Sequence, residues 1–173
     1  MKIHIVGMSG SGKTTLARWI GSAFRVPAFD LDPIVYDQAG ERPATEIVRR
    51  IEEIRRLAGW VTEGAYRDAW LRALLDDSVA IVWLDPSLTT AIVRMVKRHV
   101  RAEFSGNNLH PGWGRLLRFL NYNRRTAHQQ ATETLALLEP YSSKVFRCRS
   151  SGDIAAFKRR VRVDDSRPTA DDR

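Results

Sequence analysis

Residues 7–14, GMSGSGKT, have types and a spacing that suit phosphate binding. They fit the pattern Gly-x-x-x-x-Gly-Lys-Thr, in which small residues let backbone amides surround an anion. In such a loop the lysine, here Lys13, reaches the β- and γ-phosphates of a nucleotide, and the hydroxyl of Thr14 ligates Mg²⁺. The sequence therefore predicts a binding site for ATP and Mg²⁺. The residues predicted to contact the nucleotide here are Gly7, Ser9, Gly10, Ser11, Gly12, Lys13, Thr14 and Thr15.

The segments on both sides of this loop supply the context that phosphate binding requires. Residues 2–6, KIHIV, are typical of a short buried strand. After the loop, Leu16, Ile20 and Phe24 recur at helical spacing, so the chain is expected to continue as a helix. The N-terminus of that helix adds its amides to the site. An ordinary glycine-rich turn is the alternative, and the order strand, loop, helix disfavours it.

Two carboxylates follow later strand-like segments and are candidates for the reacting end of the site. Asp32 ends the segment 26–32, and Glu63 lies near the end of the segment 60–64. Ligands of an open parallel sheet bind beyond the carboxyl ends of its strands, so we expect both acids near the phosphate loop. Asp32 is predicted to orient an acceptor hydroxyl or a water on Mg²⁺, with a turn or helix-cap role as the alternative. Glu63 is predicted to hold Mg²⁺ through water or to act as a base.

Residues around the third and fourth predicted strands extend this interpretation. Gly64 is expected to let the backbone approach a ligand, and Arg67 to clamp a phosphate or carboxylate of the acceptor. A strand-ending turn with a surface arginine is the alternative. Asp85 ends the apolar segment 79–85 and is a rival acid for Mg²⁺. Pro86 and a predicted capped helix follow it, which favours a structural role for Asp85.

Positive charge is concentrated in the segment 94–125, with Glu103 as its only acid. The first three arginines of this segment share one helical face, and a loop that contains glycine and asparagine interrupts it. This pattern predicts a basic lid over about residues 102–123 that closes over phosphates and stabilises transferred charge. A solvated basic helix pair and a nucleic-acid-binding face are the alternatives. The basic residues of the segment are Arg94, Lys97, Arg98, Arg101, Arg115, Arg118, Arg124 and Arg125.

Apolar strand-like segments alternate with amphipathic helical segments along the chain of 173 residues. The alternation predicts an α/β fold with a five-stranded parallel sheet between two layers of helices, the three-layer arrangement of P-loop NTPases. We expect one domain over residues 1–163, followed by a disordered polar tail at 164–173. Further strands are expected at residues 79–85 and 144–149, and further helices at residues 43–59, 68–77, 87–104, 115–141 and 151–161.

The composition limits the classes of partner. The chain carries 28 Lys and Arg against 20 Asp and Glu, a net charge of +8, which suits phosphorylated ligands or nucleic acid. No apolar run approaches the roughly 20 residues that a membrane-spanning helix needs, so we expect a cytoplasmic protein without membrane contact. The single cysteine, Cys148, excludes an internal disulfide, and the scattered histidines are not spaced as metal ligands.

These motifs together resemble those of the adenylate-kinase-like P-loop kinases, and more closely those of the small family of FlaR-type "DNA topology modulation" proteins. The resemblance extends from Met1 to about Val163. It is carried by the stretches GMSGSGKTTLA, FDLDPIVY, GWVTEGAYR, VAIVWLD, RMVKRHVR and FLNYNRR. It implies ATP binding and a fold of the nucleoside-monophosphate-kinase type that phosphorylates a nucleotide or another small molecule.

The resemblance to nucleoside monophosphate kinases also implies roles for arginines of the basic segment. Arg94 would pack on the donor base, and Arg98, Arg124 and Arg125 would surround the phosphates. The chain departs from the family pattern elsewhere. Residues 32–44 are too few for a large nucleotide-acceptor domain, which counts against a nucleoside monophosphate as acceptor.

Two further departures lie at the acidic positions, since Glu63 stands where aspartate is common and Pro33 follows Asp32 where another acid is expected. The favoured interpretation is a kinase that transfers the γ-phosphate of Mg-ATP to a small-molecule acceptor. Two alternatives stay open: an ATP-regulated protein that binds nucleic acid through the basic lid, and a nucleotide sensor without catalysis. The sequence defines no oligomeric state. The predicted catalytic residues are Lys13, Asp32, Glu63, Arg98 and Arg124, and the predicted acceptor contacts are Asp32, Gly64, Arg67 and Arg125.

Overall fold

The computed structural model describes residues 1–104 and 113–165. Its main feature is a five-stranded parallel sheet with the strand order β2-β5-β1-β6-β7, which confirms the predicted α/β fold. Each strand lies within or beside a segment that the sequence predicts as a strand. The strands of this sheet are β1 (Lys2–Gly7), β2 (Ala28–Asp30), β5 (Trp60–Gly64), β6 (Ala80–Leu84) and β7 (Val145–Cys148).

The position of β1 at the centre of the sheet brings the phosphate loop beside Glu63. Ile5 of β1 pairs with Glu63 of β5 on one side and with Val82 of β6 on the other. Because all five strands run in the same direction, the loops that follow β1, β2 and β5 meet at one edge of the sheet. This edge is where the sequence predicts the nucleotide and acceptor sites.

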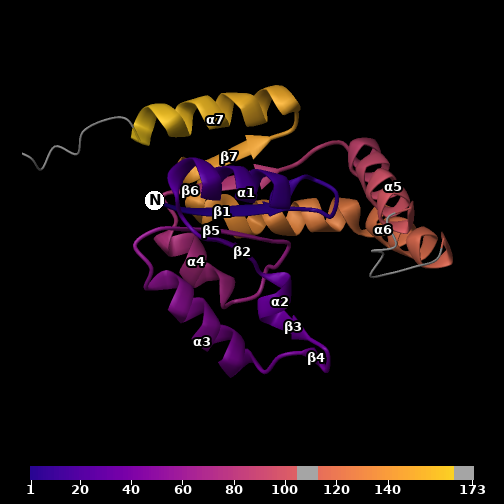
Figure 1. Ribbon diagram of the computed structural model, residues 1–173, viewed down its shortest axis with the longest axis horizontal. Coiled ribbons are helices and arrows are strands. Elements are labelled where there is room, and N and C mark those ends of the chain that lie inside the picture. Colours follow the sequence, from indigo (N-terminus) through magenta and orange to yellow (C-terminus); the bar gives the residue numbers. More distant parts are fainter. Residues whose placement is uncertain (105–112, 166–173) are drawn as a thin grey trace, which may run out of the picture.

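Helices cover both faces of the sheet (Figure 1). On one face α1 (Lys13–Phe24) and α7 (Ser151–Asp165) pack on apolar side chains of β1, β5 and β6. On the other face lie α3 (Ala44–Arg55), α4 (Leu71–Asp77) and the C-terminal end of α6 (Trp113–Leu138). The alternate residues of each central strand divide between these two cores, which is why β6 is apolar along its whole length.

The basic segment forms two helices that extend past the sheet. In Figure 1, α5 (Leu88–Phe104) and the beginning of α6 lie together at the right, beyond the strands. The Ser87 hydroxyl accepts a hydrogen bond from the backbone amide of Thr90 at 3.2 Å, so Ser87 caps α5. Residues 105–112 of the predicted lid lie outside the described residues. So do residues 166–173 of the predicted tail, while α7 continues through Asp165.

Three short elements between β2 and α3 were not predicted. They are the one-turn helix α2 (Asp32–Val35) and the two-stranded hairpin of β3 (Tyr36–Asp37) and β4 (Gly40–Glu41). The Asp37 carboxylate accepts a hydrogen bond from the amide of Ala39 at 2.7 Å, which stabilises the turn of the hairpin. None of the helices in the described part of the chain is long and apolar enough to span a membrane.

Candidate functional site

The phosphate loop is packed tightly against α5. Gly10 has a φ of +77°, and a Cβ on it would lie 2.5 Å from the Ala91 carbonyl oxygen and 2.9 Å from Cγ of Met95. Only glycine fits this position, because a side chain would meet the backbone of α5 and because the left-handed φ disfavours other residues. Helix α5 therefore forms a wall of the phosphate loop.

Lys13 and Thr14 at the start of α1 lie where a nucleotide's phosphates and its metal would bind. Nζ of Lys13 donates to the Met8 carbonyl at 3.4 Å, which holds the ammonium inside the curve of the loop. Oγ1 of Thr14 donates to Oε1 of Glu63 at 2.5 Å. The register of β1 and β5 produces this second contact, because it brings the end of β5 level with the start of the loop.

Burial governs the ionisation of both charged groups. Burial lowers the pKa of Lys13 below its ordinary 10.5, an effect that the nearby carboxylates of Glu63, Asp32 and Asp30 oppose and that Arg98 strengthens. Burial raises the pKa of Glu63 above its ordinary value, against the hydrogen bond from Thr14 and the charge of Lys13. The charge of Lys13 thus interacts with those of Glu63, Asp32 and Asp30, the three acids at this edge of the sheet.

A cleft of about 760 Å³ opens from the phosphate loop along α1, α5 and α7. Arg94 is fixed at its edge, because Nη1 donates to the Ser11 carbonyl at 2.9 Å. The structure brings Arg94 and Arg98 to this cleft together with the loop, as predicted. Four lining residues were not predicted as site residues: Leu16, Arg18, Ile154 and Lys158. They come from α1 and α7, and no local motif marks them. The full lining consists of Gly10, Ser11, Gly12, Lys13, Thr14, Thr15, Leu16, Arg18, Arg94, Arg98, Arg101, Ile154 and Lys158.

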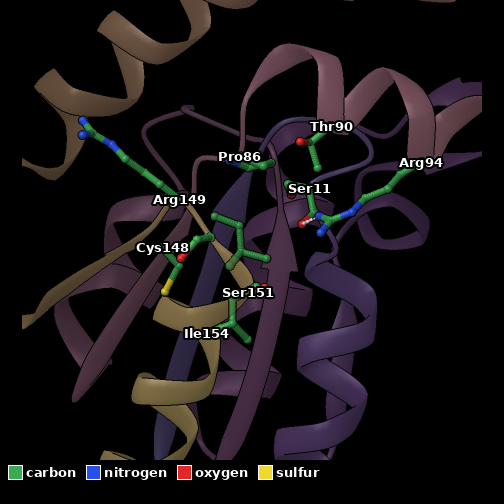
Figure 2. Close-up of a pocket in the computed structure, with 10 residues that line it drawn as sticks. Ser11, Pro86, Thr90, Arg94, Cys148, Arg149, Ser151 and Ile154 are labelled. Atoms are coloured by element: carbon green, nitrogen blue, oxygen red, sulfur yellow. Dashed lines mark hydrogen bonds between the residues drawn. The ribbon is translucent and has the colours of Figure 1, made fainter.

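A smaller pocket of about 270 Å³ adjoins the cleft and shares Ser11, Arg94 and Ile154 with it. Figure 2 shows it between the ends of β6 and β7, the start of α5 and the start of α7. Cys148 lines its wall, and burial raises the pKa of this thiol to about 11. The sequence did not predict this pocket, because its walls come from four separate segments.

On the other side of the phosphate loop, Asp32 and Tyr66 form the acceptor end of the predicted site. The Tyr66 hydroxyl donates to Oδ1 of Asp32 at 2.8 Å, and burial together with this bond raises the pKa of Tyr66 above its ordinary value. Asp30 accepts a hydrogen bond from the amide of Asp32 at 2.9 Å. A Cβ on Gly64 would lie 2.8 Å from the Tyr66 ring and 3.2 Å from Cβ of Leu31. Gly64 is therefore needed for the approach of Tyr66 to Asp32.

Arg67, which the sequence predicts to clamp the acceptor, is hydrogen-bonded to α6. Its guanidinium donates to the Thr134 hydroxyl, to the Gln130 carbonyl and to the Ala65 carbonyl, at 3.0–3.2 Å. Glu133 of α6 adds an ion-pair contact at 3.6 Å. The structure thus joins Arg67 to α6, a connection that the sequence did not predict.

The remaining predicted residues divide into two groups. Arg124 and Arg125 are exposed on α6 and are not among the residues that line the two pockets above. Asp85 accepts two hydrogen bonds from Arg147, at 2.9 and 2.6 Å, and the Arg147 guanidinium lies over the Trp83 ring at 4.0 Å. These contacts give Asp85 the structural role that the sequence predicts.

Comparison with known proteins supports a kinase-type fold. No protein-family model matches the chain. A shikimate kinase from Novosphingobium aromaticivorans is 31% identical over 117 residues, which are 56% of this chain and 60% of that protein. Among solved structures, a shikimate kinase from Bacteroides thetaiotaomicron has a TM-score of 0.56 at 14% identity, with 94% of this chain and 97% of that chain covered.

Two further structures are similar over nearly the whole chain. A shikimate kinase from Acinetobacter baumannii in complex with shikimate has a TM-score of 0.51 at 16% identity, covering 95% of this chain and 93% of that one. An uncharacterised protein from Eubacterium ventriosum has a TM-score of 0.55 at 14% identity, covering 96% and 100%. The chain therefore has the P-loop kinase fold that these structures share. The closer resemblance to FlaR-type proteins stays a prediction.

Proposed function

We propose that the protein is an ATP-dependent phosphotransferase that moves the γ-phosphate of Mg-ATP to a hydroxyl group of a small acceptor. The observation that carries this proposal is the 2.5 Å hydrogen bond between Thr14 and Glu63 beside Lys13. It places a hydroxyl, a carboxylate and an ammonium group at the point where the phosphate loop meets the acceptor side. A phosphoryl-transfer site needs these groups together, because its catalysis consists of positioning and of charge stabilisation.

The Thr14 and Glu63 side chains fit Mg²⁺. Both supply hard oxygen ligands, and Mg²⁺ in kinases is bound by one or two protein oxygens, substrate phosphates and water. In this assignment Thr14 would ligate the ion through Oγ1, and Glu63 would hold its waters. Mg²⁺ bound there would neutralise charge on the β- and γ-phosphates. Lys13 would contact the same phosphates, and their negative charge would oppose the lowering of the Lys13 pKa by burial.

The transfer step uses the acceptor side of the site. The acceptor oxygen forms a bond to the γ-phosphorus while the bond from that phosphorus to the bridging oxygen breaks, and ADP leaves with the electron pair. Because the Tyr66 hydroxyl donates to Oδ1 of Asp32, we assign Oδ2 of Asp32 as the base. Oδ2 would accept the proton of the acceptor hydroxyl. Arg98, in the cleft beside the loop, stabilises the charge on the transferred group.

The two pockets suggest where the rest of the donor binds. The cleft that contains Arg94 and Arg98 suits the phosphates, and the adjoining pocket beside Arg94 suits the base. The guanidinium of Arg94 would stack on that base. For the acceptor, the relatives named shikimate kinase make shikimate the first compound to test.

A screen of ATP consumption tests the proposal. Purified protein is incubated with Mg-ATP and one candidate acceptor at a time: shikimate, other small hydroxy acids, nucleosides and nucleoside monophosphates. We expect at least one acceptor to raise ADP production above the acceptor-free rate, and we expect Lys13→Ala to remove that increase while the circular dichroism spectrum is unchanged. If no acceptor raised the rate above that of Lys13→Ala although ATP bound, the protein would be a nucleotide-binding protein without this activity.

A further inference from the structure

We infer that Arg67 is a positioning residue, which fixes the loop after β5 to the lid-bearing helix α6 and does not bind the acceptor. This inference rests on the proposed function. It differs from the expectation that Arg67 clamps an anionic group of the acceptor. The difference matters for the identity of the acceptor, because an acceptor that is not held by Arg67 does not need a phosphate or carboxylate at that point.

The hydrogen bonds of the Arg67 guanidinium carry the first step of the argument. Nε and Nη2 both donate to Oγ1 of Thr134, at 3.2 and 3.0 Å. Nη2 also donates to the Gln130 carbonyl at 3.0 Å, and Nη1 donates to the Ala65 carbonyl at 3.2 Å. A guanidinium has five N–H groups, so these bonds use four of them. What is left cannot form the paired bonds with which arginine holds a carboxylate or phosphate.

The Thr134 hydroxyl is a site built for this arginine. Thr134 is 2% exposed, and its own O–H donates to the Gln130 carbonyl at 2.7 Å. A hydroxyl has one donor and two acceptor positions, so the two bonds from Arg67 complete its hydrogen-bonding capacity. Arg67 and the preceding helical turn together use all three hydrogen-bonding positions of this buried hydroxyl, which indicates a fixed contact. The side chain would have to give up several bonds to reach a ligand.

The neighbour of Arg67 in sequence connects this contact to the acceptor end. Tyr66 donates to Asp32 at 2.8 Å, so Asp32, Tyr66, Arg67 and Thr134 form one continuous connection from the carboxylate to α6. Arg124 lies ten residues before Thr134, which is about 15 Å along the helix. The connection therefore fixes the distance between the acceptor carboxylate and the helix that carries the lid arginines. An error of about 1 Å in such a geometry can cost about 100-fold in rate.

Thr134 variants separate positioning from acceptor binding without touching Arg67. Thr134→Val removes the hydroxyl and keeps the shape of the side chain, and Thr134→Ser keeps the hydroxyl and is the matched control. With an acceptor found by the screen above, we expect Thr134→Val to lower kcat about tenfold or more while the acceptor KM stays within about twofold. Thr134→Ser should retain most of kcat. Arg67→Lys should behave like Thr134→Val, and the double variant should be no worse than either single variant.

The opposite pattern would overturn the inference. If Arg67→Lys raised the acceptor KM about tenfold while Thr134→Val changed neither constant, Arg67 would be an acceptor ligand. Failure of the proposed function looks different, because the wild-type protein would then transfer phosphate to no acceptor. Hydrogen exchange of the backbone amides of residues 64–70 decides in that case. Faster exchange in Thr134→Val than in Thr134→Ser supports the connection, and equal exchange contradicts it.

Discussion

The buried histidine of β1 provides the most quantitative test of this structure. His4 is fully buried, and its Nδ1 lies 2.9 Å from Oγ1 of Thr62, while Nε2 has no hydrogen-bond partner among the described residues. Burial lowers the pKa of His4 from 6.5 to about 3, and the charge of Lys13 contributes to the same shift. The histidine is therefore neutral in the folded protein under conditions where it is protonated in the unfolded chain.

The consequence for stability follows from this difference in pKa. Below pH 6.5, the pKa of the unfolded state, the unfolded chain binds a proton on His4 that the folded protein does not bind. The free energy of unfolding is therefore highest above this pH and falls as the pH decreases toward the folded-state pKa of about 3. The loss is about 1.4 kcal/mol per pH unit. From about pH 8 to about pH 5, His4 should therefore remove about 2 kcal/mol from the free energy of unfolding.

His4→Gln tests this magnitude, because glutamine is uncharged at every pH and can still pair with Thr62. Urea unfolding, followed by circular dichroism at pH 8 and pH 5, gives the free energy of unfolding of both proteins. Carboxylates that titrate in this range affect both proteins equally. We expect wild type to lose about 2 kcal/mol more than His4→Gln, and His128→Gln, on the exposed surface of α6, to behave like wild type. Equal losses in wild type and His4→Gln would refute the reasoning.

Two other substitutions test the site. Gly64→Ala should destabilise the protein by about 1–3 kcal/mol and lower the rate of phosphate transfer, because the new methyl group would push Tyr66 away from Asp32. Thermal unfolding measures the loss of stability, and an unchanged stability would contradict the packing described. Arg98→Lys should lower kcat by about 100-fold with little change in ATP affinity, because lysine keeps the charge and loses the paired hydrogen bonds. Single-turnover kinetics measures the rate of transfer, and nucleotide titration measures the affinity for ATP. If Arg98→Lys lowered the rate and the affinity by the same factor, Arg98 would be a binding residue only.

The fold could be predicted because its signals are local. Residues 80–84 are apolar at every position, which marks a strand buried on both faces, and the phosphate loop has its full pattern between a strand and a helix. The elements that were missed are the shortest ones. The helix α2 has four residues and the strands of the hairpin have two each, too few for any periodicity to appear. Their stability comes from turns and from packing, which a short segment does not encode by itself.

The site could be predicted only where a residue acts near its own position in the chain. Lys13 and Thr14 belong to a motif, and Glu63 follows from the parallel order of the strands. The contact between Arg67 and Thr134 could not be predicted from the neighbours of Arg67, because Thr134 lies 67 residues further along the chain. The same holds for His4, which reads as an ordinary strand residue until its burial against Thr62 is known. Side chains of this kind depend on tertiary contacts, and sequence patterns report these poorly.

The packing of α5 on the phosphate loop has a consequence for the order in which ligands bind. Gly10 lies directly against Ala91 and Met95, and Arg94 already donates to Ser11, so the donor half of the proposed site is assembled when the chain folds. Ordering a flexible side chain at a binding site costs about 0.5–1.5 kcal/mol. The side chain of Arg94 is ordered when the chain folds, so nucleotide binding does not carry this cost. Nucleotide should therefore bind with nearly its full affinity in the absence of any acceptor, and the entropy lost in forming the complete complex should appear mainly when the acceptor arrives.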